Sequence, residues 1–226
     1  MSIERIPDPN LPPDAFSGGQ MNRPRPLPIG PLTAVLIGIS VAVALFSRLG
    51  QVDNVIERLL ISRGDDPRAL ALPEIEHGEV WRLLTPIFLH FGIPHILFNL
   101  LALKDLGTVI ERLTSTRLLF GLVLVSGVLS NVGQFAFAGP FFGGMSGVVY
   151  ALLGFVWMKA RFDPASGFFL GKQTVFIMIG WFFLCMTGAL GHVANYAHGF
   201  GLAVGMIWGF VSAKIHPTQG RSLIFP

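Results

Sequence analysis

Six apolar segments dominate this sequence and restrict the folds that it can adopt. A helix needs about 20 apolar residues to cross the hydrocarbon core of a bilayer, and several of the segments approach that length. Only 13% of the residues are charged and 52% are hydrophobic, whereas about a quarter of the residues of a soluble domain are charged. We therefore predict an all-α polytopic membrane protein with six transmembrane helices. The segments are residues 30–46, 94–103 with an extension to 113, 118–137, 146–160, 174–190 and 193–213.

The rest of the chain divides into two tails and one long loop. Residues 1–29 contain seven prolines and no apolar run, which predicts a polar tail before a six-helix domain at residues 30–213. Residues 214–226 form a second short tail. Residues 48–93 hold most of the acidic residues and five arginines. Within this loop, apolar residues recur at helical spacing from Val52 to Leu60, which favours an amphipathic helix lying in the membrane interface.

The distribution of lysine and arginine predicts the orientation of the chain. These residues occur in both tails and around the connections after the second and fourth segments, but not after the third and fifth. Because short cytoplasmic loops are enriched in Lys and Arg, both termini are predicted to be cytoplasmic. The arginines of the long loop count for less, since long loops are translocated with little regard to charge.

The polar residues within or beside the apolar segments are few, and each costs free energy unless it has a partner or a purpose. They include His90 and Asn195 near segment ends. His95 and Asn99 are four residues apart, so they share one face of a helix and offer two hydrogen-bond donors to one point. The alternative is a polar clamp between two helices.

A glycine-flanked serine begins the fourth segment, in the sequence Gly143-Gly144-Met145-Ser146-Gly147. The free N–H groups at a helix N-terminus stabilise an anion there, and the glycines leave room for a peptide backbone to approach. Taken alone, the motif also fits a serine that caps the helix.

A histidine, His198, lies near the start of the last segment beside a stripe of small residues. Such stripes allow two helices to approach closely, and docking them would bring His198 towards Ser146, with Tyr150 against the imidazole. A lone membrane histidine can also be a structural hydrogen-bonding residue. The stripes are Ala197, Gly201 and Gly205 in the sixth segment, and Gly147, Ala151 and Gly154 in the fourth.

The absence of certain residue types from the sequence excludes several catalytic mechanisms. After Glu79 the only acidic residues are Asp105, Glu111 and Asp163, all predicted at or near segment ends, so no aspartate pair is available for an aspartyl mechanism. The sequence contains no H-E-x-x-H zinc motif and no evident embedded acid to complete a Ser-His-Asp triad. A serine with a histidine base remains, and that dyad is chemically sufficient for peptide hydrolysis.

Taken together, four motifs resemble those of the rhomboid family of bacterial intramembrane serine proteases, in particular the GlpG type. The resemblance extends from about Glu79 through the sixth segment. The motifs are Trp81-Arg82 in the long loop, His90 through His95 to Asn99, Gly144-Met145-Ser146-Gly147, and Ala197-His198 with Gly201 and Gly205.

The resemblance implies a rhomboid-like fold and a role for each matching residue. Ser146 would be the nucleophile, and His198 the general base and acid. His95, Asn99 and the backbone N–H of Ser146 would form the oxyanion hole. The supporting residues would be His90, Tyr150, Gly144, Gly147 and Gly201, while Trp81 and Arg82 would hold the long loop.

The resemblance also implies partners and location. Substrates would be transmembrane helices of other membrane proteins, cut near the non-cytoplasmic face through an acyl-enzyme intermediate. The protein would be an integral, multi-pass protein of the bacterial inner (plasma) membrane, in contact with the lipid bilayer. No cofactor, no metal and no nucleic acid is implied.

Two other functions stay open at this point. A catalytically silent, rhomboid-like protein could bind or chaperone membrane proteins, although such proteins usually lose the dyad that this sequence keeps. A small transporter could relay protons through His95 and His198, but the sequence shows neither embedded acids nor a repeat between its halves. His77, His192 and His216 have no predicted role.

Overall fold

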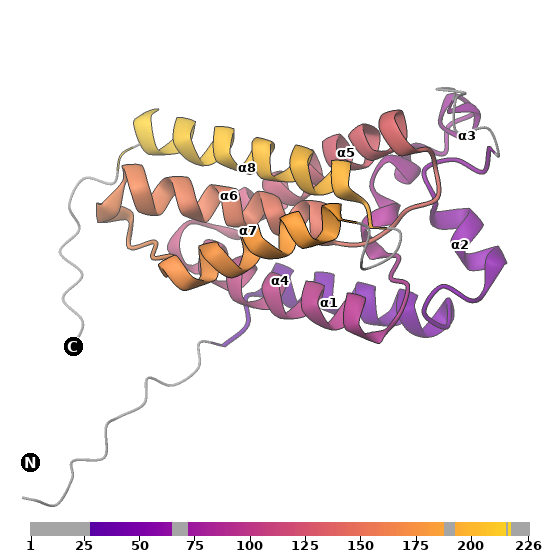
Figure 1. The fold of residues 1–226 in the computed structure, drawn as a ribbon, viewed down its shortest axis with the longest axis horizontal. Helices are drawn as coiled ribbons and strands as arrows, with labels where there is room; N and C mark the ends of the chain where they lie inside the picture. The colour runs from indigo at the N-terminus through magenta and orange to yellow at the C-terminus, as the bar shows by residue number, and fades with distance from the viewer. Residues whose placement is uncertain (1–27, 65–71, 188–192, 216, 218–226) are drawn as a thin grey trace, which may run out of the picture.

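The computed structural model describes residues 28–64, 72–187, 193–215 and 217, and within them every regular element is a helix, as predicted. Six long helices fall on the six apolar segments and form a bundle (Figure 1). They are α1 (Pro31–Phe46), α4 (Ile93–Leu113), α5 (Thr116–Ala138), α6 (Ser146–Phe162), α7 (Lys172–Met186) and α8 (Asn195–Ile215).

Three of these helices, α4, α5 and α8, are long and apolar enough to cross a membrane. Helices α1 and α7 are also apolar but shorter. The prediction of an all-helical protein with membrane spans is therefore confirmed, while the number of six spans stays a prediction. The predicted tail up to residue 27, His192, His216 and residues 218–226 lie outside the described residues.

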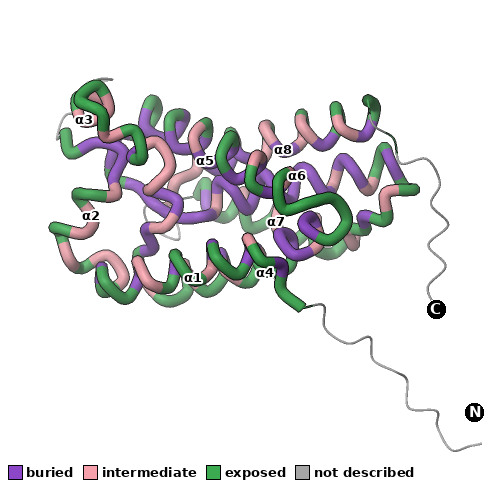
Figure 2. The backbone as a smooth tube through the Cα atoms, turned by 180° about the vertical axis from the view of Figure 1, so that it is seen from behind, coloured by how far each residue is buried: buried purple, intermediate pink, exposed green. Residues whose placement is uncertain are grey.

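Helix α6 forms the centre of the bundle. All of its residues from Gly147 to Val156 are buried, and the buried backbone gathers along the middle of the molecule (Figure 2). A helix that is buried on every face is a core helix. The helices around it expose large apolar side chains, as expected for a surface that faces lipid; examples are Phe46, Phe98, Phe120, Phe176 and Ile207.

The predicted docking of the two small-residue stripes is confirmed. A Cβ atom added to Gly201 would lie 1.9 Å from the carbonyl oxygen of Gly147, and one added to Gly205 would lie 1.9 Å from that of Ala151. Real Cβ atoms do not approach a backbone so closely, so only glycine permits this separation of α6 and α8. The contact brings the N-terminal ends of both helices to the same end of the bundle (Figure 1).

The long first loop is folded into short helices. They are α2 (Asp53–Leu59), α3 (Pro73–Glu76), η1 (Val80–Leu83) and η2 (Thr85–Phe88). Helix α2 corresponds to the predicted amphipathic helix.

Arg82 ties these short helices together. Its side chain is fully buried and donates to the carbonyl oxygens of Glu57 and Leu60 at 2.6 and 2.7 Å. It also donates to the Glu79 carboxylate at 2.6 Å, and this hydrogen bond lowers the pKa of Glu79 below its ordinary value. Trp81, the other residue of the pair, has a side chain that is 52% exposed, and its role in holding the loop stays a prediction.

Glu111 is a buried acid that ties three helices together at the opposite end of the bundle. Its carboxylate accepts the backbone N–H groups of Leu32 and Thr33, at 3.0 and 2.9 Å, and the hydroxyl of Thr33 at 2.7 Å. It also accepts the hydroxyl of Thr116 at 2.9 Å. These donors stand in the first turns of α1 and α5, where backbone N–H groups lack partners inside their own helix.

Candidate active site

The backbone before α6 adopts a conformation that favours glycine. Gly144 has φ +124°, in the region that L side chains rarely adopt, and its N–H donates to the Pro86 carbonyl at 3.0 Å. A Cβ atom at Gly144 would lie 2.6 Å from His95 Nε2 and 3.7 Å from Ser146 Oγ. His95 and Ser146 therefore border the same point, and glycine leaves that point open.

Ser146 and His198 are in direct contact. Ser146 is the first residue of α6 and His198 lies in the first turn of α8, and the Oγ of the serine lies 2.8 Å from Nε2 of the histidine. The alternative of a capping serine is not supported, because the capping position of α6 is Met145 and the Ser146 hydroxyl bonds the histidine instead.

The imidazole of His198 is positioned by aromatic packing. The ring of Tyr150 lies 4.7 Å away between centroids, at an interplanar angle of 37°, and that of Phe182 lies 6.2 Å away. The Tyr150 hydroxyl donates to the Met178 carbonyl at 3.0 Å, which fixes the phenol between α6 and α7. Within the described residues, Nδ1 of His198 is buried and has no hydrogen-bond partner.

His95 presents its second ring nitrogen to the site. The Phe91 N–H donates to His95 Nδ1 at 3.3 Å. A neutral imidazole that accepts at one nitrogen carries its proton on the other, so Nε2–H is the donor that faces Gly144 and Ser146.

Asn99 lies one turn further along α4 and is buried. Its amide nitrogen donates to the His95 carbonyl at 2.8 Å, which leaves a second N–H on the same nitrogen. The observed side-chain hydrogen bonds of His95 and Asn99 involve only this turn of α4 and Phe91 just before it. They do not form the alternative clamp between helices among the described residues.

His90 lies behind His95 and is fully buried. The two imidazole centroids are 5.0 Å apart, and Nδ1 of His90 donates to the Phe88 carbonyl at 3.1 Å. Burial, with the neighbouring His95 as a second cause, lowers the pKa of His90 to about 4. A neutral His90 thus packs against the back of the site.

Sequence reasoning missed one residue that holds the site. Gln134, in α5, accepts the N–H of Ala197 at 3.1 Å, directly before His198. The sequence signal that could have identified Gln134 is an amide side chain inside an apolar segment. It stands four residues after another polar residue, Ser130, and therefore on the same helix face. His77, by contrast, lies away from the site at the end of α3, with its ring bonded to the Pro73 carbonyl at 2.6 Å.

The fold and the site define a helical membrane protein with a serine–histidine pair between two closely packed helices. A family profile described as Rhomboid domain matches residues 77–215, more than half of the chain. The chain belongs to the rhomboid family.

Several curated proteins are similar to this chain. Rhomboid protease GlpG from Klebsiella pneumoniae subsp. pneumoniae is 36% identical over 188 residues, which cover 80% of this chain and 63% of that protein. The proteins of the same name from Salmonella paratyphi A and Salmonella choleraesuis are 42% and 44% identical over 134 and 139 residues. Each alignment covers 59% of this chain and 49% of the relative. The chain thus spans half to less than two thirds of the length of these relatives.

Proposed function

We propose that this protein is an intramembrane serine protease that hydrolyses peptide bonds in transmembrane helices of other membrane proteins. The observation that carries the proposal is the 2.8 Å contact between Ser146 Oγ and His198 Nε2. Membership of the rhomboid family and the similarity to proteins named Rhomboid protease GlpG support it.

In the proposed mechanism, Ser146 is the nucleophile and His198 the general base and acid. The serine oxygen attacks the scissile carbonyl carbon while His198 Nε2 takes the hydroxyl proton. When the tetrahedral intermediate collapses, the carbon–nitrogen bond breaks and His198 passes the proton to the leaving amine. A water molecule, deprotonated by His198, then attacks the acyl-enzyme carbonyl carbon; the ester bond breaks, His198 returns the proton to the Ser146 oxygen, and the carboxyl product leaves.

The proposed oxyanion hole consists of three donors around the open point at Gly144. They are Nε2–H of His95, the free amide N–H of Asn99, and the backbone N–H of Ser146, which has no acceptor inside α6 because it begins the helix. Preorganised donors of this kind stabilise the charge that develops on the carbonyl oxygen. Glycine at 144 keeps the space in which that oxygen would lie.

The proposal includes six membrane spans, α1 and α4 to α8, in a domain at residues 30–213, with both termini cytoplasmic and the site near the other face. The connection before α6 contains no Lys or Arg, which supports a non-cytoplasmic position for that end. Unwound segments of transmembrane helices in the bacterial inner membrane are the substrates that this arrangement fits.

Cleavage of a transmembrane reporter protein in proteoliposomes tests the proposal. Ser146→Ala and His198→Ala should each reduce the rate to background, since each removes one half of the dyad. Ser126→Ala is the matched control, because Ser126 is also a buried helical serine but bonds only the Leu122 carbonyl of its own helix. Normal cleavage by a folded Ser146→Ala variant would refute the assignment of the nucleophile.

A further inference from the structure

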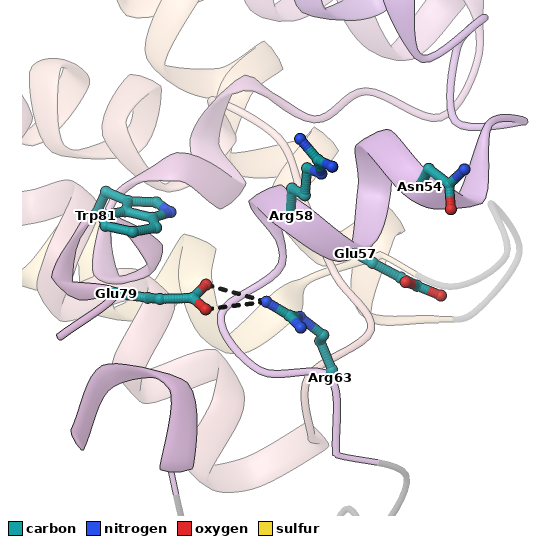
Figure 3. A pocket seen from close by; sticks show the side chains of 6 residues that line it. All are labelled: Asn54, Glu57, Arg58, Arg63, Glu79 and Trp81. Carbon is teal, nitrogen blue, oxygen red and sulfur yellow. Dashed lines mark hydrogen bonds and ion pairs between the residues drawn. The ribbon is translucent and has the colours of Figure 1, made fainter. Parts of the chain in front are cut away.

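A charged cavity of about 490 Å³ lies in the first loop, and the proposed chemistry does not use it. Its walls come from α2, from the segment that follows α2, and from the start of η1 (Figure 3). Cavities of this volume accept small ligands or parts of larger ones. The lining residues are Asn54, Glu57, Arg58, Arg63, Glu79 and Trp81.

Two of the charged groups in this cavity neutralise each other. Nη2 of Arg63 lies 3.1 Å from both carboxylate oxygens of Glu79 (Figure 3), and Glu79 is also held by the buried Arg82. Arg63 and Glu79 are therefore already paired, and they line the cavity without offering a free charge to a ligand.

The two remaining charges are available to a ligand. Arg58 and Glu57 are exposed, and within the described part of the chain their side chains take part in none of the ion pairs and side-chain hydrogen bonds observed. The lining of the cavity thus includes a free guanidinium and a free carboxylate, of opposite sign, and the amide of Asn54. Such a pair of charges suits a zwitterion better than a simple anion or cation.

Exposed apolar side chains next to the cavity suit the headgroup region of a bilayer. Val80 and Trp81, at its edge, are 60% and 52% exposed, although they are large and apolar. Tryptophan is enriched at the membrane–water interface, where one side of the ring is apolar and the other is wet. A wall of charged groups next to exposed apolar groups is expected at that depth.

We propose that this cavity binds the headgroup of phosphatidylethanolamine, with the lipid phosphate on Arg58 and the ammonium on Glu57. A guanidinium binds phosphate through parallel charge-assisted hydrogen bonds, and a carboxylate accepts the N–H groups of a primary ammonium. Trp81 provides an exposed apolar surface for the start of the acyl chains. This inference concerns a site outside the dyad and does not depend on proteolysis.

Native mass spectrometry of the full chain tests the inference. The protein, stripped of lipid in detergent, is titrated separately with short-chain phosphatidylethanolamine, phosphatidylglycerol and phosphatidylcholine. We expect phosphatidylethanolamine to bind most tightly, because phosphatidylglycerol lacks the ammonium and the choline group has no N–H to donate. The same ranking is expected for the Ser146→Ala variant, so the result is independent of the proposed catalytic function.

Two variants identify the lining groups responsible. Arg58→Ala should weaken phosphatidylethanolamine binding about tenfold, the effect of losing one charge-assisted hydrogen-bonding group. Glu57→Gln should reduce the preference for phosphatidylethanolamine over phosphatidylglycerol. Arg48→Ala and Asp53→Asn remove exposed charges that do not line the cavity and should change neither value.

Three results would overturn the inference. One is equal binding of the three lipids by the unmodified protein, and another is unchanged phosphatidylethanolamine binding by a folded Arg58→Ala variant. The third is displacement of the lipid by a polar peptide that matches the extramembrane flank of a substrate, which would identify the cavity as a peptide site.

Discussion

His198 has no carboxylate partner among the described residues, unlike the histidine of a Ser-His-Asp triad. Packing against Tyr150 and Phe182 holds the ring where Nε2 meets Ser146. In the proposed mechanism, the imidazolium that forms during attack therefore has no carboxylate beside it in the part of the chain that the structure describes. Stabilisation of the oxyanion must then supply much of the rate enhancement.

Asn99→Ala is expected to lower the cleavage rate about tenfold to a hundredfold without abolishing it. Loss of one oxyanion donor costs roughly 10²- to 10³-fold in a soluble serine protease, and here His95 and the Ser146 N–H would remain. Initial rates on the transmembrane reporter measure this effect. Complete inactivity of a folded variant would contradict the sharing of the oxyanion among three donors.

The roles of single residues could be predicted from the sequence where those residues belong to a motif. They were harder to predict where a contact depends on how a helix is rotated. The contact between His198 and Tyr150 could be predicted from the small-residue stripes. The spacing of the glycines identifies the faces of α6 and α8 that pack together. Gln134 and the loop-binding amide of Asn131, which donates to the Leu83 carbonyl at 2.9 Å, carry no such signal. Their partners are backbone groups of distant segments, and spacing alone does not identify these.

At the scale of helices, the separation of α6 and α8 is set by glycines that face backbone atoms. Gly201 lies against the Gly147 carbonyl, and Gly154 lies where a Cβ atom would be 2.8 Å from the Leu202 carbonyl. Backbone atoms cannot move aside as flexible side chains do. The position of the dyad therefore depends on these contacts as much as on Ser146 and His198 themselves.

Gly201→Ala should destabilise the protein and reduce cleavage, whereas Gly199→Ala in the same helix should do neither. The first variant pushes α8 away from α6, and such overpacking typically costs about 1–3 kcal/mol. A Cβ atom at Gly199 meets nothing within 4 Å, and alanine favours a helix by about 1 kcal/mol over glycine. Thermal unfolding in detergent measures the stability of the two variants, and the reporter assay measures their cleavage rates. Equal unfolding midpoints for the two variants would contradict the packing argument.

The helices themselves were predictable because apolar segments and their polar boundaries are visible in the sequence. The segment at 118–137 corresponds to Thr116–Ala138, and that at 146–160 to Ser146–Phe162. The contacts inside the first loop were harder to predict from the sequence. They depend on hydrogen bonds from Arg82 to backbone carbonyls, which leave no periodic pattern. The motif marked Arg82 as structural, and its hydrogen bonds to the loop confirm this; the same role for Trp81 stays a prediction.

At the scale of the whole molecule, the other five long helices surround α6, and the starts of α6 and α8 lie at one end of the bundle. The buried Glu111 and the Lys159–Asp163 ion pair, with side chains about 5% and 3% exposed, lie towards the other end. The sequence predicts that this second end is cytoplasmic because its connections carry the Lys and Arg residues. The orientation is a prediction from charge, independent of the fold.

Single-cysteine labelling in intact bacterial cells tests that orientation. In a Cys185→Ser background, a membrane-impermeant maleimide should label Phe141→Cys, which precedes α6 at an exposed position. Thr114→Cys, an exposed position between α4 and α5, should react only after the cells are opened. The reverse pattern would mean that the dyad faces the cytoplasm.

The most direct test of the central claim is labelling of the purified protein with a fluorophosphonate, which forms a covalent bond only with an activated serine. The dyad predicts labelling at Ser146, its loss in His198→Ala, and its retention in Ser126→Ala. Mass spectrometry of the labelled peptide identifies the site. An unlabelled Ser146 in the folded protein, or undiminished labelling in a folded His198→Ala variant, would contradict the account.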